Sequence, residues 1–261
     1  MYDLPEIADA TDALWSAIAA ELVQSGVGDV PPVLARSEDV EVLWADGDLL
    51  FSQACGYPLV HAFEGRLRIL ATPRYRAPGC ASARYASAIV VRKADPSRGL
   101  ADLRGRVCAI NDRSSHSGMN VLRSMIAPLA SGKPFFREVL VTGSHAASIA
   151  SVREGAADVC AVDAVTHALL ARHRPNAVAG TRVLAWSPAA PGLPFVTRAD
   201  APEALVVALR RALEAAMRDP ALEVARERLL LDGIEVLADG AYEAIRAMEG
   251  EAVSRRYPDL V

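Results

Sequence analysis

The hydrophobic positions of the chain form short continuous apolar runs separated by longer stretches with helical spacing. The short runs are bounded by turn residues, which predicts buried strands. The predicted strands cover residues 49–53, 66–75, 86–93, 106–110, 137–143, 157–163 and 182–188. Apolar residues three and four positions apart predict helices over 6–24, 38–44, 117–130, 144–155, 164–173 and 201–218. This alternation is typical of an α/β fold with mainly parallel sheets flanked by helices.

Three of the predicted strand-to-helix junctions are rich in small hydrogen-bonding residues. They lie at residues 52–57, 111–118 and 143–148. Ser and Asn at such junctions cap the free N–H groups of a helix. The same groups can also hold an anion, because ligands of parallel sheets bind where strands end and helices begin. One such junction is expected capping, but three in one small protein favour a shared anion site.

Composition excludes several classes of function. The net charge is −4 and the pI about 5.8, so no basic field attracts nucleic acid or an anionic membrane. Only Lys93 and Lys133 are lysines, and neither belongs to a phosphate-loop motif, which argues against nucleotide hydrolysis. A length of 261 residues suits one α/β domain or two small lobes.

The chain shows no membrane-spanning segment and no leader. No run approaches the roughly 20 apolar residues of a membrane helix. The first residues, "MYDLPEIADATDALW", lack a basic region followed by an apolar core, so they are not a secretory signal. We therefore expect either a cytoplasmic protein or a sequence that lacks its leader.

Cysteine and histidine spacing predicts neither a metal site nor a cofactor. The four cysteines form no Cys-x-x-Cys pair and no zinc-finger spacing. Cys108 and Cys160 lie in apolar runs and are predicted to pack in the core, whereas Cys55 and Cys80 leave a disulfide or free thiols open. No histidine pair has the spacing of a metal site. Three histidines are expected to be structural or solvent-facing: His61, His167 and His173.

Four motifs between residues 49 and 170 carry a family resemblance. They read "LLFSQACGYPL", "YASAIVVRK", "INDRSSHSGMNVLR" and "VTGSHAASIASVREGAADVCAVDAVTHALL". A Ser-x-Ser-Gly turn is followed about 25 residues later by Gly-x-His at a helix start and then by Gly-x-Ala-Asp-Val. Together the motifs resemble the phosphate and phosphonate substrate-binding proteins of ABC transporters, which have the type 2 periplasmic-binding fold.

The resemblance implies two lobes that are joined by two crossing strands, with a ligand cleft between them. The crossings are expected near residues 86–91 and 184–188. Residues 87–187 then form one continuous lobe, and residues 1–86 together with 188–261 form a discontinuous one. Family members usually open with a strand, whereas this sequence begins at what looks like the exit from that strand. We expect either an upstream start or another segment that compensates.

The implied function is capture of a small oxyanion-bearing ligand, a phosphonate, phosphate or phosphate ester, for uptake by an ABC permease and ATPase. A periplasmic or exported location goes with this function. By resemblance, Ser115, His116, Ser117 and His145 hold the phosphoryl-type group, and Asp163 contacts the other end of the ligand. The full set of candidate ligand-binding residues is Tyr2, Ser52, Gln53, Tyr57, Tyr85, Asn111, Ser115, His116, Ser117, Gly118, Ser144, His145 and Asp163.

Each of these side chains also has a simpler structural interpretation. His116 could be a solvated loop histidine, and His145 could be only a donor at a helix start. Asp163 ends a buried strand and could cap the next helix. Tyr57 and Tyr85 could be core aromatics rather than walls of a binding site.

Two other classes of function share the same fold. One is an enzyme that acts on a small precursor, with Cys55 as nucleophile and His145 facing it across the cleft. No Gly-x-Ser-x-Gly elbow is present, and the neighbouring side chains of Ser115 and His116 diverge, so neither pattern indicates a serine hydrolase. The other is a ligand-sensing module of a regulatory system. Neither the identity of the ligand nor the choice between transport and sensing follows from the sequence.

Overall fold

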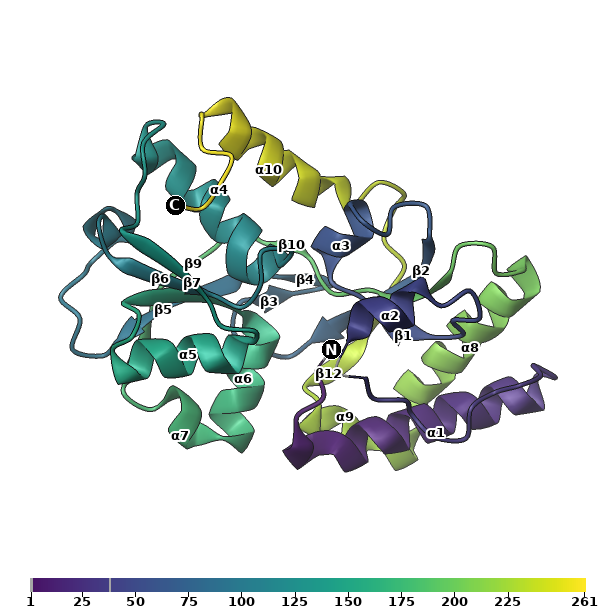
Figure 1. Cartoon of the computed structure of the whole chain (residues 1–261). Coiled ribbons are helices and arrows are strands. Elements are labelled where there is room, and N and C mark those ends of the chain that lie inside the picture. Colours follow the sequence, from purple (N-terminus) through teal and green to yellow (C-terminus); the bar gives the residue numbers. More distant parts are fainter. Residues whose placement is uncertain (1, 38) are drawn as a thin grey trace. The chain divides into compact units, whose positions relative to one another are not determined.

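The protein is described here by a computed structural model that covers residues 2–37 and 39–261 (Figure 1). Glu38, the first residue of one predicted helix, lies outside the described residues, as does Met1. The chain divides into two compact units. Unit 1 contains the described residues up to Arg76, Ala81–Ala83 and Pro191–Asp239; unit 2 contains Ala77–Cys80, Arg84–Ala190 and Gly240–Val261.

Unit 1 contains an antiparallel sheet of four strands in the order β1-β11-β2-β12. Its strands are β1 (Ser52–Gln53), β2 (Leu67–Tyr75), β11 (Phe195–Arg198) and β12 (Leu231–Glu235). Its helices are η1 (Pro5–Ile7), α1 (Ala8–Gln24), α2 (Val40–Ala45), α3 (Gly56–Val60), α8 (Glu203–Arg218), η4 (Pro220–Leu222) and α9 (Glu223–Arg228).

The core of unit 1 lies between its sheet and the apolar stripes of α1 and α8. Ile18 and Leu22 of α1 are buried together with Leu209 and Leu213 of α8. The two residues of each pair are four positions apart, about one helical turn, as the hydrophobic pattern predicts. Their burial positions the two longest helices of unit 1 against one face of its sheet.

Unit 2 contains a mixed sheet of five strands in the order β7-β6-β8-β5-β9. Its strands are β5 (Ser87–Arg92), β6 (Val107–Ile110), β7 (Glu138–Val141), β8 (Val159–Asp163) and β9 (Thr181–Trp186). Its helices are η2 (Leu100–Leu103), η3 (His116–Asn120), α4 (Val121–Ala130), α5 (His145–Glu154), α6 (Ala164–His173), α7 (Pro175–Val178) and α10 (Glu243–Ser254).

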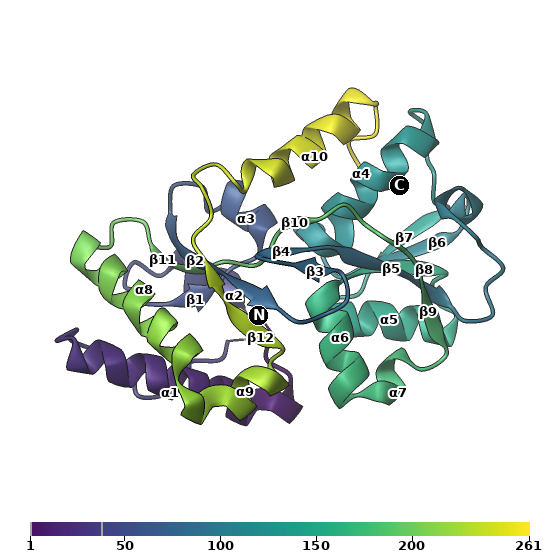
Figure 2. The same cartoon turned by 180° about the vertical axis from the view of Figure 1, so that it is seen from behind.

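Helices cover both faces of the unit 2 sheet. Helices α5 and α6 lie on one face, and α4 lies on the other with α10 packed along it (Figures 1 and 2). Strands β5, β6 and β8 are buried in this sandwich, apart from the last residue of β5. Sites that form where β6 and β8 end are therefore held by the buried central strands of this sheet.

The prediction of mainly parallel sheets is wrong. Strand β6 pairs in parallel with β7 and β8, but β5 pairs antiparallel with β8 and β9. In the unit 1 sheet, β1 pairs antiparallel with β11, and β2 pairs antiparallel with β11 and β12. A strand that is covered on both faces reads as a continuous apolar run in either direction. Burial alone therefore does not report strand direction.

The unit boundaries differ from the predicted lobes in two places. The predicted crossing segments 86–91 and 184–188 fall largely on β5 and β9, which pair with each other inside the unit 2 sheet. The chain instead changes unit between residues 76 and 84 and again at Ala190. Short strands lie at these changes and form a separate sheet: β3 (Cys80–Ala81), β4 (Arg84–Tyr85) and β10 (Ala190–Pro191).

The second difference concerns the end of the chain. Residues 240–261 were expected to join the first residues in one lobe, but they belong to unit 2. Helix α10 packs against α4, and the Val261 carbonyl accepts bonds from the N–H groups of Phe135 and Phe136. These non-local contacts carry no local sequence signal.

Most predicted elements are present near their expected positions. The exceptions are the run at 49–53, which forms only the short β1, and the start of the 117–130 helix, which is a π-turn. Helix α2 begins at Val40, because the Asp39 carboxylate accepts bonds from the N–H groups of Glu41 and Val42. Among the described residues, no helix is both long and apolar enough to cross a membrane.

Candidate functional site

The segment between β6 and α4 forms a π-turn, η3. The Asn120 N–H donates to the Ser115 carbonyl at 3.0 Å, five residues earlier, and Val121 bonds to His116 in the same way. The Ser115 Oγ accepts a bond from the Gly118 N–H at 3.0 Å, so Ser115 is the cap of this turn. A hydroxyl that accepts such a bond keeps its own hydrogen to donate.

Gly118 allows the π-turn to lie against the end of β6. A Cβ atom at this position would lie only 1.8 Å from the Asn111 Oδ1 and 3.2 Å from the His145 Cε1. Gly118, a candidate ligand-binding residue, thus lies directly against the Asn111 side chain. The Asn111 Oδ1 is buried and makes no hydrogen bond.

A contact between Ser117 and His145 joins two helix starts. The Ser117 Oγ lies 2.9 Å from the His145 Nε2. His145 is the first residue of α5, and the Ser144 Oγ caps that helix by accepting a bond from the Ala147 N–H at 3.1 Å. The junctions 111–118 and 143–148, two of the three that the sequence indicated for a shared anion site, thus meet within unit 2, whereas the junction 52–57 belongs to unit 1.

Asp163 has two roles at the end of β8. Its Oδ1 accepts a bond from the Thr166 N–H at 2.8 Å and so caps α6. Its Oδ2 lies 3.4 Å from the His145 Nε2, the ring nitrogen that also faces Ser117. In a catalytic Ser-His-Asp triad the carboxylate bonds to the other ring nitrogen, Nδ1. Here Asp163 faces Nε2, the nitrogen that Ser117 also faces, so these three side chains do not form a triad.

Burial keeps both histidines of this region neutral near pH 7. It lowers the pKa of His145, while the Asp163 carboxylate and the Ala161 carbonyl oppose that shift. Burial also lowers the pKa of His116 to about 4. Positive charge on either ring therefore requires a compensating anion.

His116 is a core residue of unit 2. Its side chain is buried, its Nδ1 lies 3.1 Å from the Asn120 Nδ2, and its ring centroid lies 6.3 Å from that of Tyr85. The interpretation as a solvated loop histidine is wrong. The predicted residues Tyr85 and His116 are neighbours, and both are buried.

Sequence reasoning missed two buried polar residues behind the π-turn, Asn120 and Arg123. Asn120 is fully buried and Arg123 is 4% exposed. A usable signal was present, because Asn and Arg three positions apart on an otherwise apolar helix must find polar partners when that helix is buried.

The predicted residues of unit 1 form a separate group. The Gln53 Nε2 donates to the Tyr75 hydroxyl at 3.2 Å, and the Tyr2 ring meets the Tyr75 ring edge-on at 5.2 Å. The Ser52 Oγ accepts a bond from the Trp44 indole at 3.3 Å. Tyr57 lies at the start of α3, where its ring centroid is 4.3 Å from that of His61. Four of the predicted residues, Tyr2, Ser52, Gln53 and Tyr57, therefore lie in unit 1, within local aromatic and hydrogen-bond contacts.

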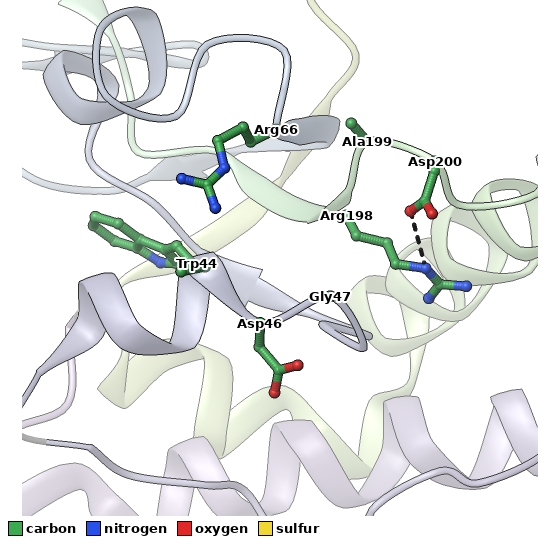
Figure 3. A pocket seen from close by; sticks show the side chains of 8 residues that line it. Trp44, Asp46, Gly47, Arg66, Arg198, Ala199 and Asp200 are labelled. Atoms are coloured by element: carbon green, nitrogen blue, oxygen red, sulfur yellow. Dashed lines mark ion pairs between the residues drawn. The ribbon is translucent and has the colours of Figure 1, made fainter.

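An open hollow on unit 1 contains none of the predicted residues (Figure 3). Its lining includes Trp44, Arg66, Arg198 and Asp200. The Arg198 Nε pairs with Asp200 at 3.2 Å, and the Arg66 guanidinium lies 5.5 Å from the centre of the Phe63 ring. Both arginines are thus engaged with neighbouring side chains.

The four cysteines are free thiols. Cys108 and Cys160 are fully buried, which confirms the prediction of core packing. Cys55 belongs to unit 1 and Cys80 to unit 2. Burial and the charge of Asp163 raise the pKa of Cys80 to about 12, so its thiolate is disfavoured. Within the described ranges, no group of three or more His, Cys, Asp or Glu residues could hold a metal ion.

Comparison with known families supports the resemblance noted in the sequence. A family described as the phosphonate periplasmic substrate-binding proteins of ABC transporters matches residues 6–242. The chain belongs to this family. The family is a substrate-binding component of transporters rather than a group of enzymes, which argues against the precursor-processing alternative. No curated protein matches the sequence.

Solved structures show the same fold. A binding protein component of an ABC phosphonate transporter from Pseudomonas aeruginosa superposes with a TM-score of 0.75 at 17% identity, over 93% of this chain and 82% of that one. PhnD1 of Prochlorococcus marinus, in complex with methylphosphonate, has a TM-score of 0.72 at 16% identity, over 95% and 94% of the chains. A Xanthomonas citri protein bound to ATP has a TM-score of 0.71 at 18% identity, over 96% of each chain. These proteins have the type 2 periplasmic-binding fold, which is the fold predicted from the sequence of this chain.

Proposed function

We propose that this solute-binding protein holds the phosphonyl or phosphoryl group of a small ligand at the starts of η3 and α5. The contact of 2.9 Å between the Ser117 Oγ and the His145 Nε2 carries the proposal, because it joins two helix starts at one point. Each start has free N–H groups and partial positive charge, which favour an oxyanion. The methylphosphonate complex of the Prochlorococcus protein, which has the same fold, supports this class of ligand.

The site holds an anion without an arginine or lysine. The Ser117 hydroxyl donates one hydrogen bond, and the His145 Nε2 donates another when it carries a proton. A bound anion favours the charged imidazole and so opposes the burial that lowers the His145 pKa. Charge-assisted hydrogen bonds of this kind allow reversible binding, so that the ligand can be released for uptake.

Asp163 supplies the complementary function. Its Oδ2 is a buried acceptor near the same histidine nitrogen. A carboxylate there disfavours a fully ionised group and favours a ligand with a hydroxyl or ammonium donor. We therefore assign it to the donor-bearing part of the ligand.

Family membership supports a proposal for the transport partners and the location. The family is periplasmic and works with ABC transporters. We propose a periplasmic location and delivery to a permease and its ATPase. A sensing role shares the same site; neighbouring genes for a permease and ATPase favour transport, and neighbouring genes for a kinase favour sensing.

Titration calorimetry with phosphate, methylphosphonate and 2-aminoethylphosphonate tests the ligand class. We expect saturable binding of at least one of them, with mass spectrometry showing each ligand unchanged after incubation. Absence of binding by all three would overturn the proposed function, and turnover of any of them would restore the enzyme alternative.

A further inference from the structure

The buried polar side chains directly behind η3 form one hydrogen-bonded network. The Asn120 Nδ2 donates to the His116 Nδ1 at 3.1 Å and to the Ile245 carbonyl at 3.0 Å. The Asn120 Oδ1 accepts a bond from the Arg123 Nη2 at 2.6 Å. The Asn120 amide thus links the two ends of the π-turn. Asn120 is the last residue of the turn and bonds to His116, the first residue, while Arg123 holds Asn120 itself.

Arg123 extends the network to the C-terminal segment. Its Nη2 pairs with the Glu249 Oε1 at 3.0 Å, and its Nη1 donates to the Pro258 carbonyl at 2.6 Å. Figures 1 and 2 both show α10, which carries Glu249, lying along α4. Residues more than 120 positions away in the sequence therefore anchor the turn, since Asn120 bonds directly to Ile245.

We propose that Asn120 and Arg123 are positioning residues that hold the Ser117–Gly118 turn in its ligand-binding geometry against α10. The inference rests on the proposed function of that turn. A single turn of π-helix is rare and frequently lies at a functional site. Without its side-chain anchors, the segment would relax toward ordinary helical bonding. That change would rotate Ser117 away from His145.

The chemistry of Asn120 makes a sharp test possible. Its amide group must act as a donor to His116 and Ile245 and as an acceptor from Arg123 at the same time. Aspartate has the same shape and keeps the acceptor, but its ionised carboxylate has no donor. Asn120→Asp therefore removes the bond to the Ile245 carbonyl and allows the His116 contact only if the His116 Nδ1 becomes the donor, and it does so without opening a cavity.

Glu249→Gln is the second variant, because it weakens the Arg123 anchor from α10 without touching the turn. Arg92→Met is the matched control. Arg92 also lies in unit 2 and bonds to the carbonyls of Val152 and Ala157 and to the Asp158 carboxylate. Those bonds lie at the starts of β6 and β8, away from the ends that carry the site.

The first readout is the Kd for methylphosphonate and for inorganic phosphate. We expect Asn120→Asp to raise Kd about tenfold or more and Glu249→Gln about two- to fivefold. Arg92→Met should lower Tm and leave Kd within about twofold. A structural role alone would instead lower Tm in all three variants and leave every Kd near the parent value, which overturns the proposal.

The second readout needs no ligand. Hydrogen exchange of the Gly118 amide, which donates to the Ser115 Oγ, reports the integrity of the turn. We expect faster exchange at residues 117–120 in Asn120→Asp, and changed ¹⁵N shifts of the His116 ring as its tautomer changes. If the parent protein binds neither anion, the proposed function fails while this measurement still decides the positioning role. Unchanged exchange in a folded Asn120→Asp protein overturns it.

Discussion

At the residue scale, one nitrogen atom organises the site. The His145 Nε2 lies 2.9 Å from the Ser117 Oγ and 3.4 Å from the Asp163 Oδ2. A single ring nitrogen carries either one proton or one lone pair, so it serves one of these neighbours fully and the other only in part. The site is therefore incomplete as a hydrogen-bond arrangement, and an incoming group that both donates and accepts would complete it.

Removal of either donor should weaken ligand binding. Charge-assisted hydrogen bonds are worth roughly 1.5–3 kcal/mol, so Ser117→Ala and His145→Ala should each raise the Kd for phosphonate or phosphate about 10- to 150-fold. Calorimetry measures the change. Ser151→Ala and His173→Ala are controls outside the site, on α5 and α6, and should bind like the parent protein. Parent-like affinity of Ser117→Ala and His145→Ala would show that their contact is only structural and that neither side chain binds the ligand.

Acidification should destabilise the fold through His116. Its pKa is lowered to about 4 in the folded protein, whereas an unfolded histidine titrates near 6.5. Between these values the unfolded state binds more protons, so the free energy of unfolding falls as pH drops from about 6.5 to about 4. The loss should be on the order of 3 kcal/mol, as an upper estimate for this group.

Urea denaturation at pH 7 and pH 4.5 measures that dependence. His116→Gln keeps a side chain that can bond to Asn120 but cannot titrate. Its loss of stability on acidification should be smaller than that of the parent protein, whatever its stability at pH 7. Equal losses in the two proteins would assign the pH dependence to other groups, such as His145 and His167, whose pKa values are also lowered by burial.

At the element scale, the π-turn packs closely against the end of β6 because Gly118 has no side chain. The Asn111 Oδ1 occupies the space where a Cβ of residue 118 would lie. At the same place, the helix that the hydrophobic pattern predicts at 117–130 begins with a π-turn instead of ordinary helical bonding. The close packing of the π-turn on Asn111 requires a glycine at position 118. The same glycine leaves room for the His145 ring beside the turn.

Gly118→Ala should destabilise the protein by roughly 1–3 kcal/mol, because a Cβ at 1.8 Å from Asn111 forces one of the two segments to move. The same substitution in an Asn111→Ala background should cost clearly less, which a double-mutant cycle of unfolding free energies measures. Gly99→Ala is the matched control, since a Cβ there meets no atom within 4 Å. Additive effects of the two changes at positions 111 and 118 would contradict this account.

At the scale of the whole molecule, the C-terminal segment is part of unit 2, which carries the proposed anion site. Tyr257 is among the largest fully buried side chains, and its hydroxyl bonds to the Val261 carbonyl. That carbonyl also accepts bonds from Phe135 and Phe136 beside β7. The last residues thus pack into the core of unit 2. The chain leaves the sheet of unit 1 after β12.

Tyr257→Ala should therefore destabilise unit 2 by about 3–5 kcal/mol, the usual cost of removing a large buried aromatic ring. Hydrogen exchange resolved along the chain is the measurement. Amides of β6 and α4 should exchange faster, while those of α1 and α8 in unit 1 should stay close to the parent rates. Arg255→Ala, on the exposed side of the same segment, should change neither. Faster exchange confined to unit 1 would contradict the assignment of residues 240–261.

The sequence by itself determined the features that depend on neighbours along the chain. Apolar spacing located β2, β5, β6, β8 and the main helices, and small polar residues marked the caps at Ser115, Ser144 and Asp163. Only the tertiary structure decided strand direction, the place of residues 240–261, the burial of His116 and the network through Asn120. Hydropathy and capping act within a few residues, whereas these outcomes depend on contacts between segments far apart in the sequence.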